Sequence, residues 1–410
     1  MGAVIDDGPE FSMAANNDTR DSTENRRQLL GEVRRIVVKV GTNVLTRDSG
    51  ELAMGRTHSL IEDIVDVHRA RHQVIVVSSG AVAMGMERLG LNTKPSSLPD
   101  LQACAAVGQS RLMSVYEQAF GRSGIATAQI LLTEYDFADR ERYLNLRNTM
   151  ERLLADGVIP IVNENDTVST SEIESLAPDG GEKGRPYGER VFGDNDRLSA
   201  QVMSKLDAEL LVLFTDVDGL FTDYSDGGSD RPLSLVKSIT PEVEAMAQRG
   251  NARGRGGMVS KLQSIRIALA AGGLAIIASG LRPRLLQSVL RGEDVGTLFL
   301  PERRLTSSKR WLAYASLPAG RVVVNTGAEE ALVERRSSLL FAGVTQIEGD
   351  FRQGDVVVLS TEAGREIGKG KTNYAAADAL PLLGKRSDEI AATHSKQAEF
   401  IHSDNIVILI

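Results

Sequence analysis

The chain has 410 residues, 42% of them hydrophobic, so it can fill the cores of two or more domains and is not disordered as a whole. It carries 47 lysines and arginines against 55 aspartates and glutamates, a formal net charge of −8, which argues against a protein built mainly to bind nucleic acid or an anionic membrane. A single cysteine, Cys104, excludes an internal disulfide and a metal site built from several thiolates, and it suits a reducing, cytoplasmic compartment.

Residues 1–33 are predicted to be a disordered lead-in, because the run is polar and contains the acidic pair Asp6-Asp7. It has no basic stretch followed by an apolar stretch, so we do not expect a signal peptide. Its first twelve residues could equally be foreign to the native protein. No segment approaches the roughly 20 unbroken apolar residues of a membrane span. We therefore expect no membrane partner.

Short β-branched runs alternate with helical patterns from Arg35 onward. Continuous apolar runs of this kind are typical of buried parallel strands. Helical spacing of apolar residues separates them, as from Leu60 to His68 and from Met258 to Leu269. The alternation predicts an α/β domain. The five runs are residues 36–42, 74–80, 158–166, 211–216 and 274–280.

All five runs end in small or polar residues. In an open parallel sheet, ligands bind beyond the carboxyl ends of the strands, where loops leave the sheet and helix N-termini present free N–H groups. One strand that ends in Ser-Gly is usually an ordinary turn. Five such ends in one chain favour an enzyme or a small-ligand binder.

The pattern changes after Leu300. Residues 301–310 are basic and polar, and we expect an exposed linker there, with a domain boundary near residue 305. Trp311 and Leu312 follow directly and could instead anchor the next unit against the first. Short alternating strands at residues 321–325, 355–360 and 405–410, separated by glycine-containing turns, predict a small β-rich module.

Neither a Walker phosphate loop nor a dinucleotide fingerprint occurs, and glycines are spread over several loops instead. Phosphoryl transfer needs cations around the phosphate oxygens, and two lysines suit that need. Lys39 lies between Val38 and Val40 in a strand that should be buried, where a lysine without an anion would be costly. The alternative is an edge-strand lysine that reaches solvent. Lys261 is expected in the first turn of a helix. A lysine there is usually a solvated surface residue, because its charge opposes the helix dipole, but an anionic ligand would remove that objection.

Asp194, Asn195 and Asp196 precede a helix with periodic apolar residues. A helix N-cap needs only one such residue. Because residues 163–166, Asn-Glu-Asn-Asp, close a strand upstream, the two groups together suggest a site that holds an ammonium or magnesium ion and orients the lysines.

Eight motifs in this chain resemble those of the glutamate 5-kinases of the amino-acid kinase superfamily, in the family's order over about residues 35–300. The C-terminal unit is similar to a PUA domain. The resemblance implies a three-layer αβα sandwich with a mainly parallel open sheet over residues 34–304 and a small β-rich PUA-like domain over 305–410. The motifs are residues 38–42, 77–81, 101–109, 139–145, 163–166, 192–200, 215–216 and 254–261.

The resemblance implies ATP-dependent phosphorylation of the side-chain carboxylate of L-glutamate, the first step of proline biosynthesis. By position, Lys39 and Lys261 would stabilise the transferring phosphoryl group and Asp196 would hold both lysines. Magnesium would be held mainly through the nucleotide phosphates, with no side chain as a metal ligand. The residues implied to bind glutamate are Ser79, Asp166 and Asn195, and those implied to bind ATP are Lys39, Gly41, Thr215, Asp216, Gly254, Arg255, Gly256, Gly257, Met258, Val259, Ser260 and Lys261.

The resemblance also implies proline as a feedback inhibitor, contact with glutamate-5-semialdehyde dehydrogenase and a homo-oligomer. Three features depart from the family pattern: residues 171–188 look like an insertion, Ser260 replaces the usual threonine, and Asp223-Tyr224 replaces the usual Asp-Pro after Gly219.

Two other functions stay open. The acceptor could be N-acetylglutamate or aspartate, as in other kinases of the superfamily. The protein could instead bind RNA through its C-terminal module, but residues 311–410 contain 10 lysines and arginines against 13 aspartates and glutamates, a poor match to phosphate contacts. We therefore do not expect a nucleic-acid partner.

Overall fold

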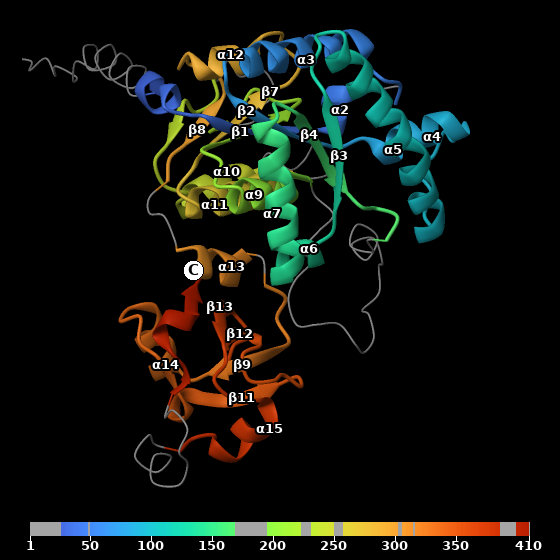
Figure 1. Cartoon of the computed structure of the whole chain (residues 1–410). Coiled ribbons are helices and arrows are strands. Elements are labelled where there is room, and N and C mark those ends of the chain that lie inside the picture. The colour runs from blue at the N-terminus through green and yellow to red at the C-terminus, as the bar shows by residue number, and fades with distance from the viewer. Residues whose placement is uncertain are drawn as a thin grey trace, which may run out of the picture.

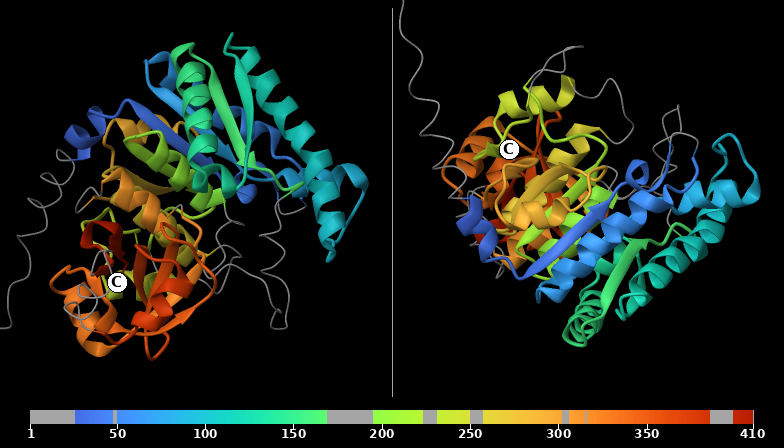
Figure 2. Two further views of the ribbon diagram at one scale, coloured as in Figure 1. Left: turned by 60° about the horizontal axis from the view of Figure 1, so that its bottom comes forward. Right: turned by 90° about the horizontal axis from the view of Figure 1, so that it is seen from above.

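The computed structural model describes residues 26–47, 50–168, 195–222, 231–249, 257–301, 306–314, 316–385 and 399–409. The predicted insertion at 171–188, the loop residues Gly254 to Gly256 and the pair Asp223-Tyr224 lie outside these ranges. Figures 1 and 2 show an N-terminal domain, coloured blue through yellow to light orange, and a C-terminal domain, coloured deeper orange to red, on one side of it. No described helix is both long enough and apolar enough to span a bilayer.

An eight-stranded sheet is the centre of the N-terminal domain, in the order β3-β4-β2-β1-β5-β7-β8-β6. Every neighbouring pair is parallel except β7 with β8. The prediction of a mainly parallel sheet is confirmed, and the five predicted runs are strands β1, β2, β4, β5 and β7. The strands are β1 (Arg35–Val40), β2 (Gln73–Ser78), β3 (Thr127–Leu132), β4 (Ile159–Glu164), β5 (Leu210–Thr215), β6 (Leu235–Val236), β7 (Leu274–Ser279) and β8 (Thr297–Phe299).

Helices cover both faces of this sheet, so the expected three layers are present (Figure 2). Side chains alternate along a strand, and Val38 therefore packs in one core with α3, α5 and α12 while Val37 packs in the other with α7, α9, α10 and α11. The helices are α2 (Thr42–Leu45), α3 (Met54–Arg69), α4 (Ala81–Leu89), α5 (Leu98–Gly121), α6 (Tyr135–Ala138), α7 (Arg140–Ala155), α9 (Asn195–Lys205), α10 (Pro241–Arg249), α11 (Met258–Ala270) and α12 (Leu285–Leu290).

The predicted disorder of residues 1–33 is wrong for the last part of that segment. Residues 26–31 are helical, and Leu30 and Val33 are buried in the core beside α12. Arg26 is only 1% exposed, and its guanidinium donates to the carbonyls of Ser234 and Val295 at 2.8 and 2.7 Å. The prediction failed because it was based on the polar composition of the whole segment, although Leu30 and Val33 near its end are apolar and pack in the core. Residues 1–25 lie outside the described ranges.

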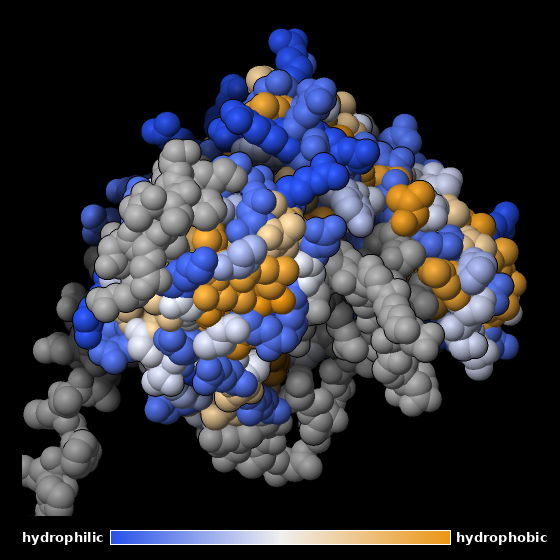
Figure 3. Space-filling view, turned by 90° about the horizontal axis from the view of Figure 1, so that it is seen from below, coloured by the Kyte–Doolittle hydropathy of each residue, from blue (hydrophilic) through white to orange (hydrophobic). Residues whose placement is uncertain are grey.

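The C-terminal domain has its own apolar core, in which the Phe341 ring lies 5.0 Å from Tyr374 and 5.2 Å from Phe400. Its sheet runs β11-β9-β12-β13-β15, with a separate β10-β14 pair, and the predicted strands are β9, β12 and β15. Seen from below, the apolar residues of the molecular surface form separate groups among polar ones (Figure 3). The elements are β9 (Gly320–Val324), α14 (Thr326–Val333), β10 (Leu339–Leu340), η2 (Phe341–Gly343), β11 (Val344–Glu348), β12 (Val356–Thr361), β13 (Glu366–Lys371), α15 (Ala376–Ala379), η3 (Leu380–Leu382), β14 (Glu399–Ile401), η4 (Ser403–Asn405) and β15 (Ile406–Ile408).

The expected exposed linker is instead a packed helix, α13 (Ser307–Tyr314), which lies between the two domains (Figure 1). Trp311 and Tyr314 pack against the core of the N-terminal domain, and Leu312 packs with Val356 and Val407 of the C-terminal domain. Arg310 is 6% exposed, and its buried guanidinium donates to the carbonyl of Ser204 in α9. The alternative expectation, that Trp311 and Leu312 anchor an interface, describes this arrangement better. Residues 302–305 lie outside the described ranges.

Candidate functional site

The candidate site lies at the carboxyl ends of the central strands. Lys39 is on β1, Ser79 directly follows β2, Asn163 is near the end of β4, and Thr215 ends β5. β1 lies between β2 and β5, and β4 pairs with β2, so these ends are neighbours along one edge of the sheet. This is the edge where open parallel sheets bind ligands.

Two lysines from different elements meet one buried carboxylate. Lys39 Nζ lies 2.6 Å from Asp196 Oδ1, and Lys261 Nζ lies 3.2 Å from Asp196 Oδ2. Asp196 is in the first turn of α9 and Lys261 in the first turn of α11. The structure therefore brings together the three residues that the sequence analysis assigned to catalysis.

The charge balance of this triad suits an anionic ligand. Full burial would raise the pKa of Asp196, but the charges and hydrogen bonds of Lys39 and Lys261 outweigh burial and lower that pKa below its ordinary value. One carboxylate between two ammonium groups leaves a net positive charge. The N-termini of α9 and α11 add partial positive charge at the same place.

A chain of amide groups connects Asn195 to the interior of the domain. Asn195 Nδ2 donates to Ser79 Oγ at 2.9 Å and to Asn163 Oδ1 at 3.1 Å, and Asn163 Nδ2 donates to Gln109 Oε1 at 2.8 Å. Each amide in this relay therefore has a fixed orientation. Among the described residues, Gln109 Nε2 and Asn195 Oδ1 at its two ends have no hydrogen-bond partner.

Gln109 was not among the predicted site residues. It is 9% exposed on α5, and its place four residues after Ala105 puts it on the buried stripe of that helix. A polar residue on an apolar stripe was the signal that could have found it. Helix α5 lies close to helix α4 because Gly108 has no side chain. A Cβ at Gly108 would lie 1.7 Å from the carbonyl oxygen of Ala81, the first residue of α4.

The loop after β2 also depends on a glycine. Gly80 has φ +105°, a left-handed conformation that side chains rarely adopt, and it caps α4. This turn places Ser79 within reach of Asn195. Asp166 lies two residues beyond β4 and is half-buried.

The end of β5 forms the other half of the site. Thr215 Oγ1 donates to Asp216 Oδ1 at 3.0 Å, and Asn43 Nδ2 donates to Asp216 Oδ2 at 2.9 Å. Partial burial would raise the pKa of Asp216, but these hydrogen bonds and the Lys261 charge lower it. A Cβ at Gly41 would lie 3.6 Å from Lys39 Nζ, so Gly41 leaves room beside that ammonium group.

The predicted glycine loop is described only from Gly257, which caps α11. Met258, Val259, Ser260 and Lys261 form the first turn of that helix. The described residues contain no group of three or more His, Cys, Asp or Glu side chains that could hold a metal ion.

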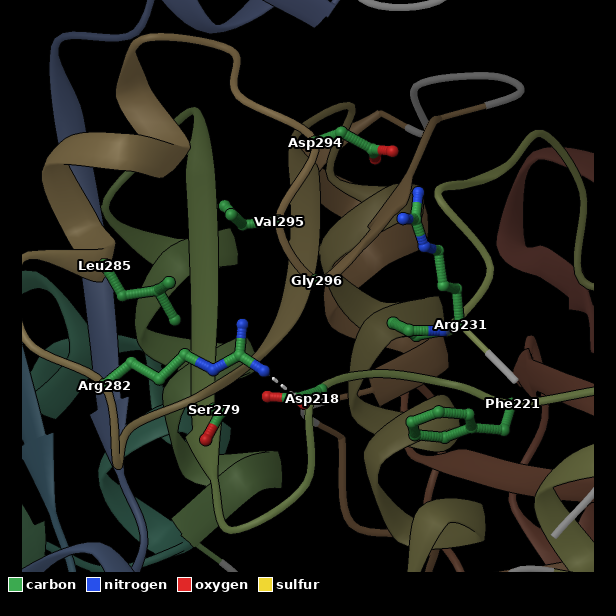
Figure 4. Close-up of a pocket in the computed structure, with 10 residues that line it drawn as sticks. Asp218, Phe221, Arg231, Ser279, Arg282, Leu285, Asp294, Val295 and Gly296 are labelled. Carbon is green, nitrogen blue, oxygen red and sulfur yellow. Dashed lines mark hydrogen bonds and ion pairs between the residues drawn. The ribbon is translucent and has the colours of Figure 1, made fainter. Parts of the chain in front are cut away.

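A cavity of about 330 Å³ that was not predicted from the sequence has Asp218 in its lining, two residues after Asp216 (Figure 4). Asp218 follows β5, Ser279 ends β7 and Gly296 precedes β8, so the cavity lies at the carboxyl ends of β5 and β7. Arg282 forms an ion pair with Asp218 across it, at 2.6 Å. It is large enough for part of a small ligand.

Two family models match the chain: "Amino acid kinase family" over residues 34–279 and "PUA domain" over residues 320–393. A glutamate 5-kinase from Moorella thermoacetica is 44% identical over 388 residues, which cover 93% of this chain and 98% of that protein. A glutamate 5-kinase from Carboxydothermus hydrogenoformans is 42% identical, covering 93% of this chain and all of that protein. Among solved structures, a carbamate kinase from Giardia lamblia bound to AMP-PNP is 18% identical and covers 66% of this chain and 100% of that one, with a TM-score of 0.46.

Proposed function

The chain belongs to the amino acid kinase family, and we propose that it transfers a phosphoryl group from ATP to the side-chain carboxylate of L-glutamate, giving L-glutamyl 5-phosphate for proline biosynthesis. The relatives named glutamate 5-kinase match nearly the whole chain. The structural observation that carries the proposal is the pairing of Lys39 and Lys261 with Asp196.

The two lysines supply what the reaction needs. A carboxylate oxygen of glutamate attacks the γ-phosphorus of ATP, the bond from that phosphorus to the bridging oxygen breaks, and ADP leaves with the electron pair. Lys39 and Lys261 would stabilise the charge on the transferring group, and Asp196 would hold them in place. The acceptor is already an anion, so no general base is needed.

The nucleotide would bind on the β5 side of the site. We propose that Gly41, Thr215, Asp216 and the residues from Gly254 to Lys261 contact ATP, and that the cavity beside Asp218 takes its nucleoside part. Gly257 offers no capping side chain at the start of α11, so the first-turn N–H groups of this helix would suit phosphate oxygens. Magnesium would arrive with the nucleotide and be held mainly by its phosphates.

The α-ammonium and α-carboxylate groups of glutamate would bind on the β2–β4 side of the site. Asp166 offers a carboxylate for the ammonium group, and Ser79 and Asn195 offer a hydroxyl and an amide beside it. The acceptor carboxylate would then lie near Lys39, because Asn195 and Asp196 are consecutive in α9 and Asp196 pairs with Lys39.

Other expectations stay proposals. The identity of the relatives favours glutamate over N-acetylglutamate or aspartate as acceptor. We propose that the N-terminal domain includes the segment from residue 26, because Leu30 and Val33 lie in its core, and we keep the domain boundary near residue 305. We also propose proline as an inhibitor that shares the α-group contacts of glutamate, contact with glutamate-5-semialdehyde dehydrogenase, a homo-oligomer and a cytoplasmic location.

The test is ATP turnover with L-glutamate, N-acetyl-L-glutamate and L-aspartate, with the acyl phosphate trapped as a hydroxamate. We expect hydroxamate with L-glutamate and at most traces with the other two. The Asp196→Asn variant controls for contaminating kinases, since it should lose the activity. Preferred turnover of another acceptor, or equal turnover by this variant, would overturn the proposal.

A further inference from the structure

Helix α13 is hydrogen-bonded to helix α9 at two places. Arg310 Nη1 donates to the carbonyl of Ser204, near the C-terminus of α9, at 3.1 Å. Near the other end, Gln201 Nε2 and Arg197 Nη2 donate to the carbonyl of Tyr314 at 2.8 and 3.4 Å. The two helices therefore run antiparallel, and each end of the contact has its own side-chain-to-carbonyl bonds.

The Tyr314 carbonyl is well suited to receive these donors. It belongs to the last residue of α13, where helical carbonyls lack the amide partners of an ongoing helix and carry partial negative charge. Gln201 is 2% exposed, and it lies four residues after Arg197 on the same face of α9. Both side chains therefore approach the carbonyl from one side.

The first turn of α9 lies between this contact and the candidate site. Asn195 bonds to Ser79 and Asn163, Asp196 pairs with Lys39 and Lys261, and Arg197 bonds to α13. Three consecutive residues thus connect the acceptor side, the two cations and the helix between the domains. A shift of α13 would act on Asp196 through the adjoining residue.

The C-terminal domain also contacts α13. Leu312 and Ala313 pack with Val356 and Val407 of that domain. Lys369 of β13 also donates to the carbonyl of Ser316, just after α13, at 3.4 Å. The helix is therefore held between two apolar surfaces, and its position depends on both domains.

We propose that Arg197 and Gln201 are positioning residues for phosphoryl transfer, through which α13 and the C-terminal domain behind it hold the first turn of α9 and hence Asp196 in place. The inference rests on the proposed function. Lys39 and Lys261 would keep their separation only while this turn is fixed from the α13 side.

The test compares Arg197→Met, Arg197→Lys and Arg310→Met in the full-length chain. Arg197→Met should lower kcat about tenfold to a hundredfold, with the KM values for ATP and glutamate within about threefold, because displaced cations mainly affect the transition state. Arg197→Lys keeps a donor and should retain most of kcat. Arg310→Met removes the bond to Ser204 and the ion pair with Asp207 at the far end of α9, and it should lower thermal stability while the folded protein keeps its kcat.

Two results would overturn the inference: wild-type kcat in Arg197→Met, or equal losses of kcat in Arg197→Met and Arg310→Met, which would indicate a structural role only. If Arg197→Met does not fold, Gln201→Met decides by the same criteria. A second readout needs no turnover. The side chains of Lys39 and Lys261 are 8% and 12% exposed, and amine acylation read by mass spectrometry should increase at these lysines in Arg197→Met and not in Arg310→Met. This readout separates failure of the inference from failure of the proposed function, which would appear as a wild-type chain that does not phosphorylate glutamate.

Discussion

Lys39 Nζ lies 2.6 Å from Asp196 Oδ1, so a cation on the central strand is fixed by a carboxylate on the first turn of a helix. The lysine is 6% exposed, and a charged amine at that depth is stable only with such a partner. This pair is neutral by itself, and Lys261, which also pairs with Asp196, gives the site its net positive charge.

We predict that Lys39→Met and Lys261→Met each lower kcat by about 10²–10³, the usual effect of removing one preorganised electrostatic group. The KM for glutamate should change little, since the lysines act on the phosphoryl group rather than on the ammonium group of the acceptor. Steady-state kinetics with both substrates varied will show this. Wild-type kcat in either variant would exclude that lysine from the transition state.

The amide relay leads to a second prediction. Gln109→Leu removes the acceptor for Asn163 Nδ2, so Asn163 can rotate and Asn195 loses a fixed partner. One such hydrogen bond contributes about 1 kcal/mol, and we expect the KM for glutamate to rise about fivefold to tenfold with the KM for ATP unchanged.

Gln109→Glu keeps an acceptor oxygen and should restore most of the glutamate affinity. Gln118→Leu changes the same residue type at an exposed position of α5 and is the matched control. Equal defects in Gln109→Leu and Gln109→Glu would show that packing, and not the relay, determines the effect.

Much of the fold could be predicted because buried parallel strands have continuous apolar runs, and Lys39 stood out as a charge inside one of them. The partners could not be predicted. Gln109 meets Asn163 across 54 residues, and Arg310 meets Ser204 across 106. The polar composition of residues 301–310 also led to a wrong prediction of an exposed linker. An arginine such as Arg310 can bury its aliphatic stem while its guanidinium donates to a buried carbonyl.

Glu134 makes the stability of the fold depend on pH. Burial raises the pKa of its carboxyl to about 7, although the charges of Arg197 and Lys369 act in the opposite direction. The folded protein therefore holds this proton more tightly than the unfolded chain does. The resulting stabilisation is complete below the unfolded pKa of 4.5 and is lost as pH rises through about 7.

We expect Glu134→Gln to match the wild type in free energy of unfolding near pH 4.5 and to be more stable at pH 8, by no more than about 3 kcal/mol. Urea unfolding at both pH values measures the difference. Glu141→Gln, at an exposed position of α7, should show no such trend. A Glu134→Gln chain that is less stable at pH 8 would mean that the carboxylate is stabilised by Arg197 and Lys369 more than burial penalises it.

Arg26 links the N-terminal helical segment to the wall of the cavity beside Asp218. Its guanidinium donates to the Val295 carbonyl at 2.7 Å and to Asp294 Oδ1 at 3.2 Å, and both of these residues line the cavity. Burial lowers the pKa of Arg26, and the charge of Asp294 raises it. The buried guanidinium is therefore stabilised by its bonds to Asp294 and Val295.

Arg26→Met should therefore loosen the Asp294–Val295 wall, raise the KM for ATP about threefold to tenfold and leave the KM for glutamate unchanged, because glutamate is proposed to bind on the other half of the sheet edge. Arg27→Met, at the next and exposed position, is the matched control and should leave both KM values unchanged. Thermal unfolding separates the two roles that Arg26 combines, since a lower melting temperature alone reflects lost hydrogen bonds. If Arg26→Met melts earlier yet keeps the wild-type KM for ATP at a temperature where it is fully folded, the cavity wall does not contact the nucleotide, and the nucleoside must bind elsewhere along the β5 side.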